Sequence, residues 1–456
     1  MGSGGSLDLV TDGTSLRVKH GFRHSPVFVF LRAALSFGAL SVLAKLVGLL
    51  KEVVIASRFG VSHALDIYLM GMVFIAVPVS ILVVAMQSTL IPELVDKEEQ
   101  AAARLLGRTL KFAAAMLVIA LPIWLALLPL TIKTIQPAAD PTHLDQLHRT
   151  CLWLIPYYFF LGINCLLYGA LQARRVFWPN ALLPGVFHLT ILTALTLVSQ
   201  AEIKVMLAGT AMGTMIETGI LFVILRRANL LTIRDTSGAG LLHVMKLALP
   251  LMLGGVVFSF APAIEQMLAY RLGSGAVSLL NYGNKLPSSL SGLLLTAISV
   301  VILPHFAELN AHYRWQASRK LFVQSSLALM AFGFLVAMVC LAWAEPMVRV
   351  VFERGAFKTG STREVAELMR VYLLQLPFTM VTVVSYRALT ALGDTKTMTF
   401  AAVMQVLGAA LVGYVLSQSL GVTGIALGTV TMAALVACWL GGVTWWRFGL
   451  RMKESG

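Results

Sequence analysis

Residues 68–92 read YLMGMVFIAVPVSILVVAMQSTLIP, a stretch without a single acidic or basic side chain. A transmembrane helix needs about 20 consecutive apolar residues, so a helix over this stretch is long enough to cross a membrane. The stretch follows Arg58-Phe59-Gly60. The second half of the chain repeats this arrangement with Arg271-Leu272-Gly273 and an apolar run that ends at Leu303-Pro304. The sequence therefore predicts two related sets of membrane-spanning helices.

Two further matches extend the repeat. The segment YGALQA at 168–173 recurs as YRALTA at 386–391, and GTAMGT at 209–214 recurs as GIALGT at 424–429. The three matches fall in the same order, each at an offset of about 215 residues. Two related bundles that pack face to face leave a site at their interface, and rocking of the bundles can open that site to either side. The repeat therefore favours a transporter.

The composition excludes a soluble globule. Of the 456 residues, 58% are hydrophobic and only 12% are charged, and the mean hydropathy is +0.83. These proportions leave too little polar surface to cover a soluble protein of this length. A soluble fold would bury apolar runs of about 10 to 14 residues, whereas most runs here reach about 18 or more. We therefore expect an all-α integral membrane protein.

The apolar runs and their charged or Gly/Pro-rich breaks predict about twelve spanning helices, six in each half. The predicted spans are 33–59, 66–94, 110–131, 150–173, 177–199 and 205–225, then 247–270, 278–306, 321–345, 366–392, 397–418 and 422–446. Six spans per half make the repeat parallel, with two six-helix lobes around a central cavity. The predicted organisation is a tail at 1–27, a first lobe at 28–230, a linker at 231–246, a second lobe at 247–446 and a tail at 447–456.

The positions of Lys and Arg predict the orientation in the membrane. Most of the 35 basic residues fall in the two tails and in every second loop between the predicted spans. Cytoplasmic loops retain positive charge, so both termini are predicted to be cytoplasmic. The net charge of +14 then reflects this retention and attraction to anionic membrane lipids, and it indicates no nucleic-acid partner.

Ionisable residues at membrane depth are the main candidates for a functional site, because a charge there is costly and normally faces a partner or a water-filled cavity. Lys45 and Glu52 are seven residues apart and share one face of the first predicted helix. The full set of predicted cavity residues is Lys45, Lys51, Glu52, Asp66, Lys285 and Arg387. Glu217 and Glu265 are further candidates, for ion coupling.

Simpler roles remain open for several of these residues. Lys51 and Arg370 lie near helix ends, where a long stem can carry the charge to the lipid headgroups. Glu265 could instead form an ion pair with Arg271 or Lys285. Glu217 could instead cap a polar pocket. The cluster Asp140, His143, Asp145 and His148 lies in a predicted external loop and lacks a zinc-type spacing, so a solvated loop is favoured. We expect neither a metal nor a cofactor.

Several segments resemble one family. The stretch LAKLVGLLKEVVIA at 43–56, with Phe59-Gly60 and Asp66, is similar to the opening of the MviN/MurJ-like lipid II flippases. These are members of the multidrug/oligosaccharidyl-lipid/polysaccharide exporter superfamily. The stretch 275–304, FERGAF at 352–357 and DTKT at 394–397 extend the resemblance over nearly all of the chain after the tail.

The resemblance implies a flippase of the bacterial inner membrane. Such a protein binds the diphosphate and sugars of an undecaprenyl-linked precursor in a cationic cavity and moves it to the outer leaflet by alternating access. By position, Lys45, Lys51 and Lys285 stand where the family has functional arginines, and Glu52 and Asp66 where it has acidic residues. A lysine supplies charge for a diphosphate but lacks the planar fork of arginine. The membrane potential or a monovalent cation is the expected driving force.

The sequence departs from the family in two places, and both departures mean that substrates other than lipid II have to be considered. Pro78 is followed by Val79-Ser80-Ile81 in place of an Arg-Arg pair, and only a short tail follows the twelfth predicted span. Another lipid-linked saccharide of the cell envelope therefore stands beside lipid II. The alternatives are a cation-coupled drug exporter of the same superfamily and a polytopic enzyme on lipid-linked sugars. The enzyme is disfavoured because the chain lacks an Asp-x-Asp pair and a His-Glu-x-x-His helix.

Overall fold

The computed structural model describes residues 26–135, 141–198, 202–232, 244–246, 260 and 262–454, and every regular element over these residues is helical. The first half contains α1 (Pro26–Phe59), α2 (His63–Val79), a π-helical segment (Ser80–Val84), α3 (Ala85–Val95), α4 (Glu99–Ile135), α5 (Pro141–Trp153), α6 (Ile155–Ala173), α7 (Trp178–Leu182), α8 (Pro184–Leu197) and α9 (Ile203–Arg227). The second half contains a helical segment at 262–270, then α11 (Ala276–Ala311), α12 (Trp315–Ala342), α13 (Ala344–Phe352), α14 (Thr359–Leu373), α15 (Leu376–Leu392), α16 (Thr395–Leu420) and α17 (Val422–Glu454).

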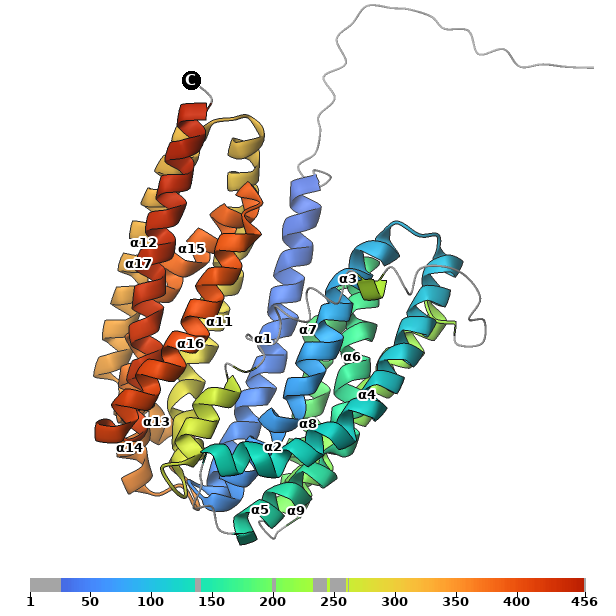
Figure 1. Cartoon of the computed structure of the whole chain (residues 1–456), viewed down its shortest axis with the longest axis vertical. Coiled ribbons are helices and arrows are strands. Elements are labelled where there is room, and N and C mark those ends of the chain that lie inside the picture. Colours follow the sequence, from blue (N-terminus) through green and yellow to red (C-terminus); the bar gives the residue numbers. More distant parts are fainter. Residues whose placement is uncertain are drawn as a thin grey trace, which may run out of the picture.

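The helices form two groups that follow the two halves of the sequence (Figure 1). In the first group α8 packs between α1 and α9, and α6 packs on α3, α4 and α9. In the second group α15 contacts α11, α12 and α17, while α16 lies along α17. The groups converge at the end that holds α13, α14 and the start of α2, and they splay apart toward the end that holds the C-terminus. Contact between the groups runs mainly from α2 to α11 and from α1 to α13.

Many of the helices are suited to a membrane. Over the described residues, eight helices are long and apolar enough to span one, or nine when the bent pair α5–α6 counts as one span. The predicted span 247–270 lies mostly outside the described residues. Residues 1–25 of the predicted tail and 233–243 of the predicted linker lie outside them too. The prediction of an all-helical membrane protein is confirmed at this level.

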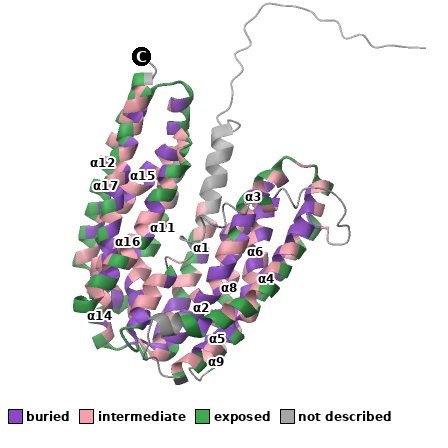
Figure 2. Cartoon of the chain, viewed as in Figure 1, coloured by how far each residue is buried: buried purple, intermediate pink, exposed green. Residues whose placement is uncertain are grey.

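Lipid-facing surfaces are recognisable by their exposed apolar side chains. Only 17% of the most apolar window of α12 is buried inside the protein, and Figure 2 shows exposed residues along the outer faces of the second group. On α16, Leu407, Leu411 and Val415 are all exposed. In water such a surface would drive aggregation, whereas hydrocarbon solvates it.

A proline at position 78 explains the irregular middle of the span at His63–Val95. Proline removes a backbone donor and its ring crowds the preceding turn, which breaks the regular hydrogen-bond ladder. The chain responds with the π-helical segment Ser80–Val84, two residues after Pro78. Such π segments are a known way for a helix to accommodate a local disruption.

The predicted external loop around His143 is wrong, because residues 141–153 form α5. This helix meets α6 at an angle of 47°, so the span predicted at 150–173 is the second arm of a bent pair. The loop prediction rested on the polar composition of the segment. An amphipathic helix can have the same composition, because its polar residues lie on one face and its apolar face packs against α2.

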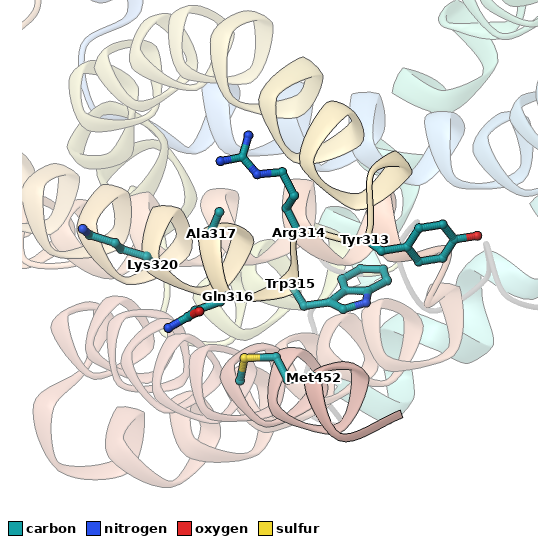
Figure 3. A pocket seen from close by; sticks show the side chains of 7 residues that line it. All are labelled: Tyr313, Arg314, Trp315, Gln316, Ala317, Lys320 and Met452. Atoms are coloured by element: carbon teal, nitrogen blue, oxygen red, sulfur yellow. The ribbon is translucent and has the colours of Figure 1, made fainter. Parts of the chain in front are cut away.

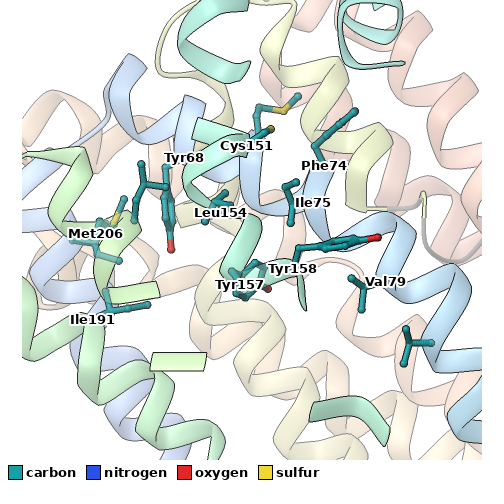
Figure 4. Close-up of a cluster of buried hydrophobic side chains, with 14 of the residues drawn as sticks. Tyr68, Phe74, Ile75, Val79, Cys151, Leu154, Tyr157, Tyr158, Ile191 and Met206 are labelled. Atoms are coloured by element: carbon teal, nitrogen blue, oxygen red, sulfur yellow. The ribbon is translucent and has the colours of Figure 1, made fainter. Parts of the chain in front are cut away.

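The interior of the first group is an apolar cluster that contains several hydrogen-bonded polar groups (Figure 4). Tyr158 is fully buried, and its hydroxyl donates to the carbonyl of Leu117 at 3.0 Å. The hydroxyl of Tyr68 lies 2.8 Å from that of Thr210, which ties α2 to α9. These bonds satisfy polar atoms that burial would otherwise destabilise, and they fix how the helices pack.

Candidate functional site

A cavity of 270 Å³ lies where α1, α8 and α11 meet, and basic side chains dominate its charge. Lys45, Gly48 and Glu52 of α1 line one wall, spaced along a single helix face as their intervals require. Lys285 of α11 lines the opposite wall. The cavity therefore has walls from both halves of the chain, and we call it the lysine cavity.

Glu52 joins the two halves through an ion pair at this cavity. Lys285 Nζ lies 2.7 Å and Lys51 Nζ 3.0 Å from the same oxygen, Glu52 Oε1. The side chains of Glu52 and Lys51 are only 9% and 10% exposed, whereas that of Lys285 is 33% exposed. Lys51 also stands 5.9 Å from the ring centroid of Phe187. Lys51 is therefore an internal ion-pair partner, and the alternative in which its stem reaches the headgroups is wrong.

The charges at the cavity do not balance. Lys45, Lys51 and Lys285 carry three positive charges, and Glu52 carries one negative charge. Glu52 and Lys51 are buried and offset each other, so the excess positive charge lies on Lys45, which is exposed, and on Lys285, which is 33% exposed. An anion with several oxygen acceptors, such as a diphosphate, is suited to bind between Lys45 and Lys285.

A second cavity of 200 Å³ adjoins the first, with Lys285 and Ser288 lining both. Its other walls come from the segment 262–270, from α11 and from α14. They are mainly polar and uncharged, and their lining residues include Glu265, Gln266, Asn281, Asn284 and Tyr372. We call it the amide pocket, after the three side-chain amides in that set.

Asp66 lies at the contact between the halves rather than on the wall of either cavity. Its carboxylate oxygens accept hydrogen bonds from the backbone N–H groups of Gly275, at 2.5 Å, and Ser278, at 2.7 Å. These groups stand at the start of α11, where a helix leaves donors without partners and favours negative charge. Asp66 is fully buried, so an α2 side chain caps a helix of the opposite half. Because the backbone engages both of its oxygens, Asp66 caps a helix and lines neither cavity, contrary to the prediction.

Two glycine turns bring the backbones of the halves together beside this cap. The Ala356 N–H donates to the Ser57 carbonyl at 2.8 Å. Gly355 has a φ of +56°, and a Cβ there would lie 2.3 Å from the Ser57 oxygen. Gly60 has the same φ, and a Cβ there would lie 2.5 Å from the Ala356 oxygen. Only glycine permits both this backbone conformation and this approach.

Replacing Gly355 with alanine is expected to destabilise the closed contact by about 2 to 5 kcal/mol. A left-handed alanine costs roughly 1–2 kcal/mol, and overlap with a rigid backbone atom adds about 1–3 kcal/mol. Thermal unfolding in detergent should show a lower Tm for Gly355→Ala. Gly360→Ala is the matched control, because nothing lies within 4 Å of a Cβ there and its φ is not positive. Equal Tm values for the two variants would contradict the proposed tight approach.

The remaining predicted residues are distributed over the two groups. Arg387 lies near the end of α15, is partly buried, and lines neither the lysine cavity nor the amide pocket. Glu217 of α9 is 6% exposed and accepts a hydrogen bond from the hydroxyl of Tyr168. Glu265 lines the amide pocket and accepts from the hydroxyl of Thr429 rather than pairing with Arg271 or Lys285.

Sequence reasoning missed His188. It lines the lysine cavity from α8, and its Nδ1 atom is buried without a hydrogen-bond partner over the described residues. A Cβ on Gly48 would lie 3.0 Å from His188 Cδ2, so this glycine makes room for the imidazole. The available signal was a histidine in the middle of the apolar run 177–199. The amides of Gln266 and Asn284 carry no such signal, because a lone amide in a helix is common.

A larger cavity of 680 Å³ lies away from these residues, between the α11–α12 turn and the C-terminal end of α17 (Figure 3). Trp315 and Met452 face each other across it, and Arg314 and Lys320 stand at its rim. Tyr313 is 75% exposed, so this is a surface groove. Its lining residues, as far as the structure describes the chain, all come from the second half, so it is not the site between the halves.

Comparisons with known proteins identify the family. A family model described as lipid II flippase MurJ matches residues 18–451. A probable lipid II flippase MurJ from Synechocystis is 22% identical over 410 residues, which cover 86% of this chain and 76% of the relative.

Two solved structures share the fold. The structure titled "Lipid II flippase MurJ, inward closed conformation" has a TM-score of 0.77 and 20% identity, covering 89% of this chain and 86% of the other. An inward-facing multidrug resistance MATE family transporter of the MOP superfamily has a TM-score of 0.76 and 12% identity, covering 93% and 99%. At these identities the structures show the fold alone, and the family follows from the sequence match over most of the chain. The protein belongs to the lipid II flippase MurJ family, whose members are membrane transporters rather than enzymes.

Proposed function

We propose that the protein moves lipid II, or a related undecaprenyl-diphosphate-linked saccharide, from the cytoplasmic to the outer leaflet of the bacterial inner membrane. The observation that carries this proposal is the lysine cavity. Lys45, Lys51 and Lys285 outnumber the single carboxylate of Glu52 at the contact between the halves. An excess of ammonium groups in a cavity attracts a diphosphate and repels a cationic drug. The family's name supports lipid II as the substrate.

We infer that transport proceeds by alternating access between two six-helix lobes, with both termini in the cytoplasm. In this orientation the end of α1 at Phe59 faces outward, and Asp66 and Gly355 hold the outer side closed. The splayed end then faces the cytoplasm, where the precursor is made. Separation of the Asp66 contact and closure of the opposite ends would release the substrate outward. A membrane potential favours this direction by about 2.3 kcal/mol per negative charge per 100 mV.

The proposed function is tested with purified protein in detergent and in lipid vesicles. Lipid II, undecaprenyl diphosphate and the lipophilic cation tetraphenylphosphonium are compared as ligands, and flipping of labelled lipid II is followed in vesicles. Saturable binding of the two diphosphate lipids with flipping of lipid II supports the proposal. Binding of the cation alone, with neither diphosphate lipid bound, would overturn it.

A cation-coupled exporter is the second candidate, and two carboxylates favour it, one buried (Glu217) and one partly buried (Glu265). Glu217 in the first half and Glu265 in the second each accept a hydrogen bond from one hydroxyl group. Over the described part of the chain, neither makes an ion pair with a basic side chain. A carboxyl in such surroundings either holds a proton or binds a cation. Within a flippase, the same groups would couple lipid movement to a proton or Na⁺ gradient.

Replacing Glu217 with glutamine is expected to lower gradient-driven flipping tenfold or more while leaving lipid II binding unchanged. Glutamine keeps an oxygen that accepts from Tyr168, but it can neither release a proton nor balance a cation. Flipping is measured in vesicles with and without an imposed pH or Na⁺ gradient. Glu202→Gln is the control, because Glu202 is exposed at the start of α9. A Glu217→Gln protein with full gradient dependence would exclude Glu217 from coupling.

A further inference from the structure

The amide pocket contains more hydrogen-bonding capacity than the protein itself uses. Gln266 Oε1, Asn284 Oδ1 and the hydroxyl of Tyr372 are buried polar atoms without a hydrogen-bond partner over the described residues. All three residues line this one pocket, and Tyr372 is fully buried. Buried polar groups in folded proteins are nearly always paired, because an unpaired one is destabilising. Three of them around one cavity indicate a polar ligand.

The charges around the pocket narrow the chemistry of that ligand. Lys285 at its border disfavours a cation, and Glu265 in its wall disfavours a second anion. The remaining groups are neutral amides and a hydroxyl, which both donate and accept hydrogen bonds. A neutral ligand with several hydroxyl or acetamido groups matches this set. The volume of 200 Å³ is below the roughly 300–1,000 Å³ of pockets for drug-sized ligands, so it suits one sugar ring rather than a whole headgroup.

We propose that the amide pocket binds the first sugar of the lipid-linked saccharide, the residue attached directly to the diphosphate. This inference rests on the proposed function, because it takes the diphosphate to lie in the lysine cavity. The two cavities share Lys285 and Ser288, so a diphosphate beside Lys285 places the attached sugar at the mouth of the amide pocket. Gln266 and Asn284 then pair with sugar hydroxyl or acetamido groups, and Tyr372 with a further oxygen. The lysine cavity provides affinity, and the amide pocket distinguishes a sugar-bearing lipid from a bare one.

The test compares binding of lipid II and of sugar-free undecaprenyl diphosphate to purified protein, with each variant shown to remain folded. The variants are Gln266→Met, Asn284→Leu and Tyr372→Phe, which remove hydrogen-bonding groups while keeping a side chain of similar shape and the same charge. Each is expected to weaken lipid II binding about three- to tenfold, the range for one neutral hydrogen bond, and to leave undecaprenyl diphosphate binding unchanged. Tyr282→Phe is the matched control. Tyr282 is also buried on α11 with an unpartnered hydroxyl, but it packs against Phe352 and Phe357 and does not line the pocket.

The outcomes separate this inference from the proposed function. If the wild type binds neither lipid, the proposed function fails and this inference fails with it. If the wild type binds both lipids equally, or if all three variants keep the wild-type preference for lipid II, the sugar site is overturned while the diphosphate site stands. A loss of preference in the three variants, but not in Tyr282→Phe, supports the amide pocket as the sugar site.

Discussion

Replacing Lys285 with alanine is expected to weaken lipid II binding at least tenfold and to abolish most flipping. Lys285 contributes to both the lysine cavity and the amide pocket, and it is the more exposed partner of Glu52, so its ammonium group is accessible to a ligand. A hydrogen bond to a charged group contributes about 1.5–3 kcal/mol, which corresponds to roughly ten- to a hundredfold in affinity. Glu52 retains Lys51 at 3.0 Å, so the fold should survive the loss.

Binding of labelled lipid II to purified variants measures this effect. Lys285→Arg keeps the charge and should retain most of the affinity, which separates loss of charge from loss of packing. Lys396→Ala removes an exposed lysine in the first turn of α16 and should bind as the wild type does. Lys45→Ala is expected to show a decrease similar to that of Lys285→Ala. Affinity of Lys285→Ala within twofold of the wild type would remove the lysine cavity from consideration as the diphosphate site.

Replacing Asp66 with alanine is expected to shift the protein strongly toward separation of the halves at their converged end. The change removes two acceptors and leaves the N–H groups of Gly275 and Ser278 buried without partners. Each lost partner costs about 1–3 kcal/mol, so the loss of two weakens the closed contact by roughly 2–6 kcal/mol. A change of this size alters the ratio of closed to open molecules by about 30-fold or more. Asp66→Asn keeps one acceptor oxygen and should be intermediate.

Spin labels on Ala64 and Lys358, both exposed and on opposite sides of the contact, measure this shift. The four native cysteines, Cys151, Cys165, Cys340 and Cys438, are free and must first be replaced. The distance distribution of Asp66→Ala should extend to longer values than that of the wild type. Asp145→Ala, which removes a carboxylate exposed on α5, should leave the distribution unchanged. Coincident distributions for Asp66→Ala and the wild type would exclude Asp66 as a latch between the halves.

Much of the candidate site was predictable because the signals were local. An apolar run without charge, such as residues 68–92, predicts a membrane span whatever surrounds it, because it contains no charged side chain that would need a partner in the membrane. The seven-residue interval between Lys45 and Glu52 places both on one helix face, and both line the lysine cavity. The polar segment after Pro141 was misjudged as a loop, because its helix depends on packing against α2.

The internal repeat shows where prediction from sequence ends. Glu265 precedes Arg271 by the same interval as Glu52 precedes Arg58, so the repeat makes the two carboxylates equivalent. In the structure Glu52 pairs with Lys51 and Lys285, whereas Glu265 accepts from Thr429. Equivalent positions thus acquire different chemistry, because the neighbours come from other helices.

Composition and run length were sufficient to establish a helical membrane protein, and they indicated which charged residues are costly enough to require a role. Tertiary packing decided the partner of each residue. Lys285 pairs with Glu52, 233 positions away in the sequence. Asp66 binds the backbone of Gly275 at the start of α11, 209 positions away, instead of lining the cavity. His188 and the amides of the second pocket joined the site in the same way. The physical reason is that hydrophobicity and helix period are properties of a segment, whereas an ion pair or a cap requires two segments to be brought within about 3 Å of each other.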